Sequence, residues 1–270
     1  MTTPTDIFAA NRATGRIALA VAAQDARTRR TKVHEDGSLR VRFPHADTPA
    51  LEAVIVNTGG GMTGGDRFAV EISLEEGASV IAGTAAAEKI YRSTGSDAEM
   101  TVRLALSAGA KLCWLPQETI LFDRARLKRR IDIELAEGAS LLVAEAVVFG
   151  RAAMGEAMAQ GYFADHWRLR RAGRLIYADS ARFDGAIAEK LGRRAVANGG
   201  IAIASVLIAP GNEDTLTRVR AIEFEGEVGI SAWNGFALAR LCAKDGAALR
   251  HDLIAVLAAL GQLVPRLWLQ

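Results

Sequence analysis

Short segments in which apolar and polar residues alternate run through the first two thirds of the chain. The clearest is residues 68–74, Phe-Ala-Val-Glu-Ile-Ser-Leu, in which every second residue from Phe68 is apolar. A period of two residues predicts a strand with one buried face. Two further strands are predicted over residues 17–23 and 39–43, with the polar turn 35–38 between them.

A longer pattern repeats this alternation. An alternating segment, a Gly-Ala turn and a second alternating segment occur together around Gly77, Gly109 and Gly138, and a looser copy surrounds Gly173. A unit that recurs about every 30 residues usually stacks on its neighbours, because no single unit can bury its own apolar face. The repeat therefore predicts a mainly β fold of stacked β-layers, either β-helix-like or sandwich-like.

The period changes near the carboxyl end, where apolar residues recur at helical spacing over residues 249–260. This spacing predicts an amphipathic helix. A second short helix is predicted over residues 236–243, with Asn234 placed to cap it. The expected organisation is thus one β-rich domain over residues 1–270, with a small C-terminal helical portion within residues 234–262.

A glycine loop lies between two predicted strands: residues 59–65 contain five glycines. The loop contains G-x-G-x-x-G, but a strand and not a helix follows it, which excludes the dinucleotide-binding fingerprint. No P-loop is present. Glycine permits positive φ and close approach of another chain. The loop is therefore interpreted either as a tight, bulged strand connection or as a backbone surface for a partner or ion.

Composition excludes several classes of protein. Half of the 270 residues are hydrophobic and the net charge is +2, too small to indicate nucleic acid or an anionic membrane as partner. Apolar runs of at most about ten residues are too short to span a bilayer. The two cysteines, Cys113 and Cys242, form no C-x-x-C, which fits a reducing compartment, and a cytoplasmic location is expected.

Catalytic signatures are missing from the sequence. There is no G-x-S-x-G elbow, and the four histidines show no metal-binding spacing. Several carboxylates instead lie in apolar or glycine-rich segments, namely Asp66, Glu118, Glu145 and Glu156. A buried acid must be neutralised, paired or bound to metal. Ion pairing within the fold and a transient cation path both remain open, and the candidate partners are Arg67, Arg92 and Arg151.

Five short motifs occur in one order along the chain. They are Gly60-Gly61-Met62-Thr63-Gly64-Gly65-Asp66-Arg67, Lys89-Ile90-Tyr91-Arg92-Ser93, Trp114-Leu115-Pro116-Gln117-Glu118-Thr119-Ile120-Leu121-Phe122, Gly150-Arg151-Ala152-Ala153-Met154-Gly155-Glu156 and Val264-Pro265-Arg266-Leu267-Trp268. Together they resemble the urease accessory protein family UreD, also called UreH. The chain departs from the family at residues 83–88, where Gly-Thr-Ala-Ala-Ala-Glu replaces Thr-Thr-Gln-Ala-Ala-Thr.

The resemblance implies a non-enzymatic maturation chaperone with a β-rich fold. It implies assembly with a UreF-type accessory protein and a UreG-type GTPase on the urease apoprotein, to insert nickel into the urease active site. No tightly bound cofactor is implied; nickel(II) is in transit, through a tunnel in the UreD-like subunit. Carboxylates and water suit such transit better than thiolates, which hold borderline metals tightly.

We therefore expect Asp66, Glu118 and Glu156 to line or flank an internal nickel path, paired by the three arginines when no metal is present. A second expectation is a partner interface or structural motif formed by Gly60, Gly61, Gly64, Gly65, Arg67, Tyr91, Arg92 and Arg151. Two alternatives remain: a passive assembly scaffold that does not contact metal, and a β-solenoid enzyme acting on polysaccharide with Glu118, Asp123 and Glu156 as acid and base.

Overall fold

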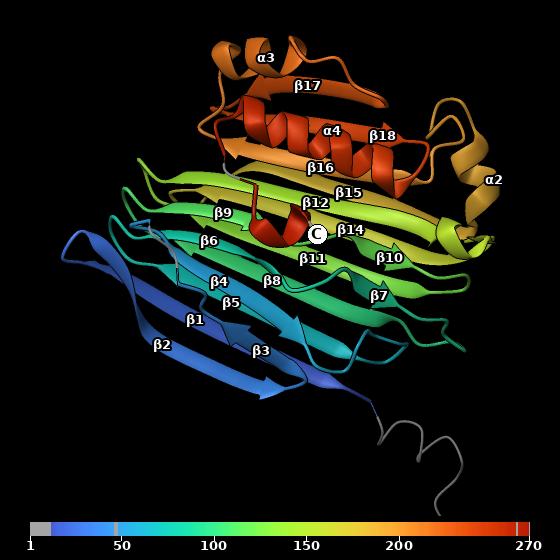
Figure 1. The fold of residues 1–270 in the computed structure, drawn as a ribbon, viewed down its shortest axis with the longest axis horizontal. Coiled ribbons are helices and arrows are strands. Elements are labelled where there is room, and N and C mark those ends of the chain that lie inside the picture. Colours follow the sequence, from blue (N-terminus) through green and yellow to red (C-terminus); the bar gives the residue numbers. More distant parts are fainter. Residues whose placement is uncertain (1–11, 46–47, 263, 270) are drawn as a thin grey trace, which may run out of the picture.

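The computed structural model describes residues 12–45, 48–262 and 264–269 and consists mainly of two stacked β-sheets (Figure 1). The first, sheet A, has seven strands. In spatial order they are β15 (Arg174–Ala186), β14 (Gln160–Arg171), β11 (Arg126–Leu135), β8 (Ala98–Leu106), β5 (Arg67–Leu74), β1 (Thr14–Gln24) and β2 (Arg27–Gly37).

The second sheet, sheet B, has eleven strands. Its main path runs through β17 (Glu227–Trp233), β18 (Phe236–Ala243), β16 (Ala202–Ala209), β12 (Ser140–Arg151), β9 (Lys111–Leu115), β6 (Ser79–Thr84), β4 (Leu51–Asn57) and β3 (Leu39–Arg42). The short strands β7 (Glu88–Ile90), β10 (Thr119–Leu121) and β13 (Glu156–Ala157) adjoin this path. The predicted mainly β fold of stacked layers is confirmed, as are the two early strands.

The repeat explains how the layers form. Strands β5, β8, β11 and β14 pair in parallel in sheet A, and β4, β6, β9 and β12 pair in parallel in sheet B. Three Gly-Ala turns carry the chain from sheet A to sheet B, and Gly77, Gly109 and Gly138 adopt φ of +67°, +66° and +75° there. The looser copy at Gly173 differs, because its turn folds β14 back onto β15 within sheet A.

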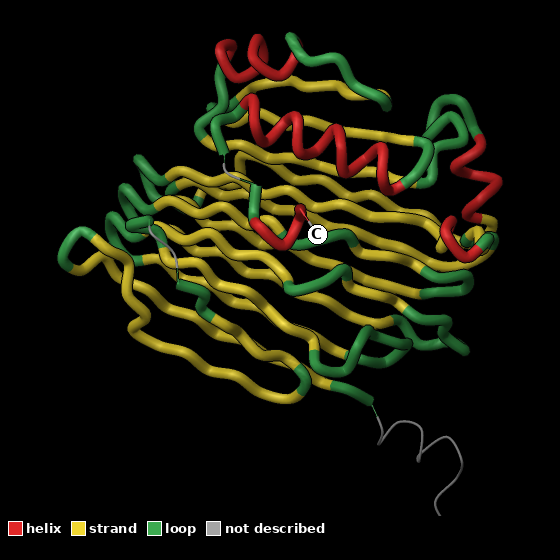
Figure 2. Tube along the Cα trace, in the orientation of Figure 1, coloured by secondary structure: helices red, strands yellow, loops and turns green. Residues whose placement is uncertain are grey.

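Apolar side chains form two layers. One lies between the sheets, where alternate residues of both sheets meet. The other covers the outer face of sheet B beneath α4 (Gly246–Ala259), which crosses β16 and β18 (Figures 1 and 2). The shorter helices are η1 (Ala152–Met154), α2 (Ile187–Gly192), α3 (Glu213–Arg220) and η2 (Arg266–Leu269). Within the described residues, no helix combines the length and apolar character needed to cross a membrane.

The predicted C-terminal helix is confirmed by α4, whereas the helix predicted over residues 236–243 is wrong. That segment is strand β18, the partner of β17 in a hairpin. Asn234 does not cap a helix; with Gly235 it forms the two-residue turn of this hairpin, at φ of +49° and +76°. Asn-Gly favours such turns because both residues tolerate positive φ. Both faces of β18 are largely buried, which hid its strand period.

Four of the five sequence motifs gather at one edge of the two sheets, opposite the Gly-Ala turns, whereas the closing motif over residues 264–268 belongs to the outer apolar layer with α4. The glycine loop over residues 58–66 leads directly into β5, as predicted, and lies beside β7 through a bridge between Met62 and Ile90. Strands β7 and β10 lie at the same edge (Figure 1), and β13 pairs with the last two residues of β12. We call this side, which is formed by the ends of strands and not by an edge strand, the motif edge.

Candidate functional site

A cavity of about 140 Å³ opens between the two sheets at the motif edge. Its outer part is lined by the exposed residues Gly60 and Ala86, and its inner part by the fully buried Trp114 and by Glu145, which is 4% exposed. The cavity thus reaches from the surface into the apolar layer between the sheets. It is the candidate functional site because a carboxylate lies at its deep end.

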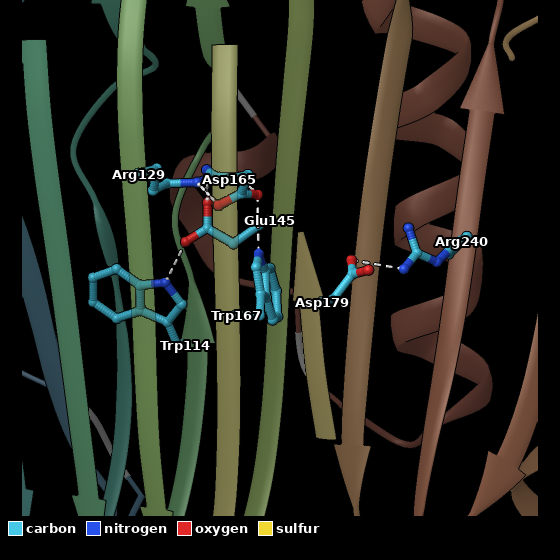
Figure 3. Close-up of polar contacts among 7 residues, drawn as sticks. All are labelled: Trp114, Arg129, Glu145, Asp165, Trp167, Asp179 and Arg240. Atoms are coloured by element: carbon cyan, nitrogen blue, oxygen red, sulfur yellow. Dashed lines mark hydrogen bonds and ion pairs between the residues drawn. The ribbon is translucent and has the colours of Figure 1, made fainter. Parts of the chain in front are cut away.

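Glu145 belongs to a buried charge cluster that joins the two sheets (Figure 3). The Arg129 guanidinium of β11 ion-pairs with Glu145 of β12, and the Trp114 Nε1 donates to Glu145 Oε1 at 2.7 Å. Arg129 also donates through Nε and Nη2 to the two carboxylate oxygens of Asp165, at 3.0 and 2.6 Å. Trp167 Nε1 completes the set with a 2.9 Å bond to Asp165 Oδ2. The buried side-chain nitrogens and oxygens of the cluster are therefore all hydrogen-bonded, and the Arg129–Glu145 pair links the two sheets.

The charges of this cluster do not balance, because one guanidinium faces two carboxylates. Burial raises the pKa of Glu145, and Asp165 adds to this increase, although Arg129 and Trp114 act to lower it. Burial opposes the charge of Arg129 too, but Asp165 and Glu145 together raise its pKa above the ordinary value. If both acids were ionised, the cluster would hold one excess negative charge in a low-dielectric interior. Such a charge favours a proton or a cation nearby.

A second carboxylate lies at the mouth of the cavity. Asn57 Nδ2 donates to Gly61 O at 3.2 Å and to Glu88 Oε1 at 2.9 Å, so that one amide ties the glycine loop to β7. Burial raises the pKa of Glu88 to about 7, with the Asn57 hydrogen bond and Lys89 opposing this effect. The mouth is therefore held together by a carboxyl group whose hydrogen-bonding partner is neutral.

The three acids predicted for the nickel path, Asp66, Glu118 and Glu156, do not line the cavity. Asp66 is buried and accepts hydrogen bonds from the Ala13 and Thr63 backbone amides at 2.9 and 2.8 Å. It therefore closes the glycine loop onto the start of β1. The described part of the chain contains no group of three acidic, histidine or cysteine side chains that could hold a metal.

The other two predicted acids each bind an arginine. Glu118 receives both Nε and Nη2 of Arg250, at 2.8 and 2.6 Å, which the sequence had not indicated. Glu156 pairs with Arg151 as predicted, and also accepts the Asp123 backbone amide at 2.8 Å. These contacts fasten loops of the motif edge. A role of the three acids in nickel transit stays a prediction.

The four glycines predicted for the partner interface differ in how closely other atoms approach them. A Cβ at Gly61 would lie 2.4 Å from the Tyr91 ring, and one at Gly64 would lie 2.3 Å from Ser96 O, so the fold itself requires these two glycines. Gly60 and Gly65 have positive φ, and Gly60 has open space around it. Tyr91 Oη donates to Gly60 O at 3.0 Å.

Two predicted arginines on the motif edge are not paired with the predicted acids in the described contacts. Arg67 pairs with Glu99 at 3.4 Å. The Arg92 carbonyl accepts the Thr63 hydroxyl at 3.1 Å. A partner interface in this region stays a prediction, since no partner chain tests it.

Sequence reasoning missed Arg129, Asp165 and Glu88. The first two could have been found from the strand period. Arg129 falls in phase with Leu127 and Ile131, which face the inter-sheet layer, and Asp165 falls in phase with buried neighbours in the same way. A charged residue at an inward position of an alternating strand is a candidate for a buried ion pair.

Comparison with known proteins shows which family the chain is similar to. The family model described as UreD urease accessory protein matches residues 13–269. A protein of Rhodopseudomonas palustris (strain BisA53) is 58% identical over 97% of this chain and 93% of its own length, and is named urease accessory protein UreD. A protein of the same name from Bradyrhizobium diazoefficiens is 58% identical over 97% of this chain and 96% of its own.

Proposed function

Because the chain belongs to the family of UreD urease accessory proteins, we propose that it passes nickel toward the urease active site through the cavity between its sheets. Membership of the family gives it a role in the maturation of urease. The relatives are named accessory proteins, in keeping with a non-enzymatic role. Nickel is here the cargo, and no resident cofactor is assigned.

The observation that carries this proposal is the pairing of two acids with one guanidinium at the deep end of the cavity, which leaves one acid to be neutralised by a proton or a cation. Glu145 lines the cavity and shares Arg129 with Asp165, so that the single guanidinium cannot neutralise both acids. A cation in the cavity would be attracted to the ionised form of this acid over a short distance in a low dielectric, and could take the place of its proton. Carboxylate oxygens bind a divalent ion of intermediate softness less firmly than thiolates, which favours release.

The partners follow from the same proposal. A UreF-type accessory protein, a UreG-type GTPase and the urease apoprotein would deliver and receive the nickel. The sequence holds no Gly-Lys-Ser/Thr phosphate loop, so that GTP hydrolysis is assigned to the GTPase. The motif edge, where the cavity opens, is the side on which a delivering partner would act.

Two variants separate a conduit from a scaffold. Glu145→Gln removes one of the two acids and leaves a one-to-one pair of Arg129 and Asp165. Ala87→Phe fills the outer cavity, and Ala105→Phe, on the exposed outer face of sheet A, is the matched control. Each is co-expressed with a urease operon that lacks its own copy of this subunit, and urease nickel content, urease activity and pull-down of the partners are measured.

We expect Glu145→Gln and Ala87→Phe to lower urease nickel content by about tenfold or more while the partners still assemble, as for disrupted metal-site neighbours. The control should activate urease normally. Normal nickel content with both cavity variants would reject the conduit. It would instead support the passive scaffold, which the engagement of Asp66, Glu118 and Glu156 with the chain's own groups also favours.

A further inference from the structure

We propose that Arg250 is a positioning residue that holds the mouth of the cavity in place from the outer face of sheet B. Arg250 lies on α4, far along the chain from the cavity-lining residues. Its guanidinium makes four polar contacts with the segment after β9 and with the carboxyl end of the chain. Its importance for transport rests on the proposed function, but the positioning itself does not.

The connection begins with the hydrogen bonds that Arg250 donates to Gln117 and Glu118. Two of its nitrogens bind the Glu118 carboxylate, and Nη2 also donates to Gln117 Oε1 at 3.3 Å. Glu118 is buried and Arg250 is only 26% exposed, so that the pair is shielded from water. The planar guanidinium fork can serve both acceptors at once, which a lysine ammonium cannot do with the same geometry.

The second step leads from Gln117 to the cavity rim, which we define as residues 84–88. Gln117 Nε2 donates to Ala85 O at 3.1 Å, and its backbone amide donates to Thr84 Oγ1 at 2.9 Å. The Glu88 amide donates to Glu118 O at 2.9 Å. Because Arg250 binds the oxygen of the Gln117 amide, the nitrogen end is directed at Ala85. The rim is thus attached to α4 through one oriented side chain.

The carboxyl-terminal motif belongs to the same arrangement. Trp268 donates its indole N–H to Leu115 O at 3.1 Å, and its own carbonyl accepts Arg250 Nη1 at 3.0 Å. Trp268 therefore fixes Arg250 against the segment that carries Gln117. We call Trp268, Arg250 and Gln117 the C-terminal relay. It gives a physical role to the closing sequence motif, which lies outside the cavity.

Hydrogen exchange of the rim amides tests the relay without reference to nickel. Arg250→Lys keeps a charge near Glu118 but loses the fork, and Gln117→Leu removes the middle of the relay while leaving the Arg250–Glu118 pair. The matched control is Arg193→Lys, which alters an exposed arginine paired with Glu189. Gln117→Leu is informative even if Arg250→Lys fails to fold.

We expect the amides of residues 84–88 to exchange about tenfold faster in both relay variants, as for one lost hydrogen bond to a charged group. The double variant should resemble either single variant, since both break one connection. Unchanged exchange of the rim, or acceleration spread evenly over the whole chain, would overturn the proposal. Faster rim exchange with normal urease nickel content would uphold the positioning and count against the conduit.

Discussion

Two glutamates line the same cavity and differ in what holds them. Glu145, at the deep end, faces Arg129 and the Trp114 indole. Glu88, at the mouth, faces the amide of Asn57. Burial raises the pKa of both; at Glu145 the ion pair with Arg129 is the first effect that opposes this increase, whereas at Glu88 it is the hydrogen bond from Asn57, followed by Lys89. The comparison teaches that burial raises the pKa of an acid whether its hydrogen-bonding partner is a guanidinium or a neutral amide, while the partner determines what opposes this increase.

The difference follows from strand positions. Arg129 reaches Glu145 because both point inward from facing strands, and the same guanidinium also reaches Asp165 on the neighbouring β14. Glu88 lies on a three-residue strand whose nearest hydrogen-bonding side chain comes from β4. The deep end of the cavity thus contains an acid that shares its guanidinium with a second acid, and the mouth contains an acid with a neutral partner and a pKa of about 7.

The largest effect on stability is expected from removing Arg129, which pairs with Glu145 and Asp165 at the deep end of the cavity. Arg129→Met should lower the free energy of unfolding by about 3–5 kcal/mol, because it leaves Glu145 and Asp165 buried without a cation. Urea denaturation followed by circular dichroism measures this change. Arg130→Met is the control: this neighbour is 53% exposed, and its loss should cost less than about 1 kcal/mol.

A triple variant sharpens this result. Arg129→Met combined with Glu145→Gln and Asp165→Asn removes all three charges, and should recover much of the lost stability because no uncompensated charge remains. Equal losses for Arg129→Met and Arg130→Met would show that the deep pair contributes no more than a surface pair. The contrast between the two ends of the cavity would then have no energetic basis.

At the mouth, by contrast, removing the charge of Glu88 should stabilise the protein at high pH. The pKa of Glu88 is raised from 4.5 to about 7, so the folded protein holds this proton more tightly than the unfolded chain does. Its contribution to stability is present below pH 4.5 and is lost as the pH rises to about 7. Glu88→Gln keeps the acceptor for Asn57 and avoids this loss. Above pH 7 the variant should be more stable than the parent, by on the order of 3 kcal/mol.

The measurement is the difference in unfolding free energy between parent and variant from pH 4 to pH 8. Glu99→Gln, which alters an exposed glutamate paired with Arg67, should give a nearly constant difference over the same range. A flat difference for Glu88→Gln as well would mean that the mouth carboxyl titrates like a surface group, and the comparison with Glu145 would fail.

The sequence predicted the stacked sheets but not which buried charged side chains pair between and within them. Gly77, Gly109 and Gly138 mark a local turn whose repetition demands stacking, so the fold could be inferred without knowledge of distant contacts. Strand β18 was missed because a short apolar run has no clear period when both faces are buried. The Asn234-Gly235 turn was the available signal for a hairpin.

The site was harder to predict. Glu145 stood out because it interrupts an apolar run, whereas Arg129 lies in a strand rich in exposed charges and is distinguished only by its phase. The burial of Glu88 depends on Asn57, 31 residues away, and on the packing of the glycine loop. Glu118 was predicted to pair, but its partner Arg250 lies 132 residues away, on a helix of the outer layer.

The smallest effect is expected at a third arginine–glutamate pair, which lies near the surface. Arg151 and Glu156 are 37% and 24% exposed, and Arg151 lowers the pKa of Glu156, with the Asp123 amide contributing. Because water screens this pair, Arg151→Gln should cost less than about 1 kcal/mol at pH 7. The lowered pKa means that this small contribution disappears as the pH falls and Glu156 takes up a proton. Urea denaturation at pH 7 and pH 4 measures the cost of Arg151→Gln at each pH. A loss of unfolding free energy as large as that of Arg129→Met would show that the exposed fraction of a pair does not determine its contribution to stability.

A separate measurement tests the nickel path: normal urease nickel content in Glu156→Ala would remove Glu156 from it.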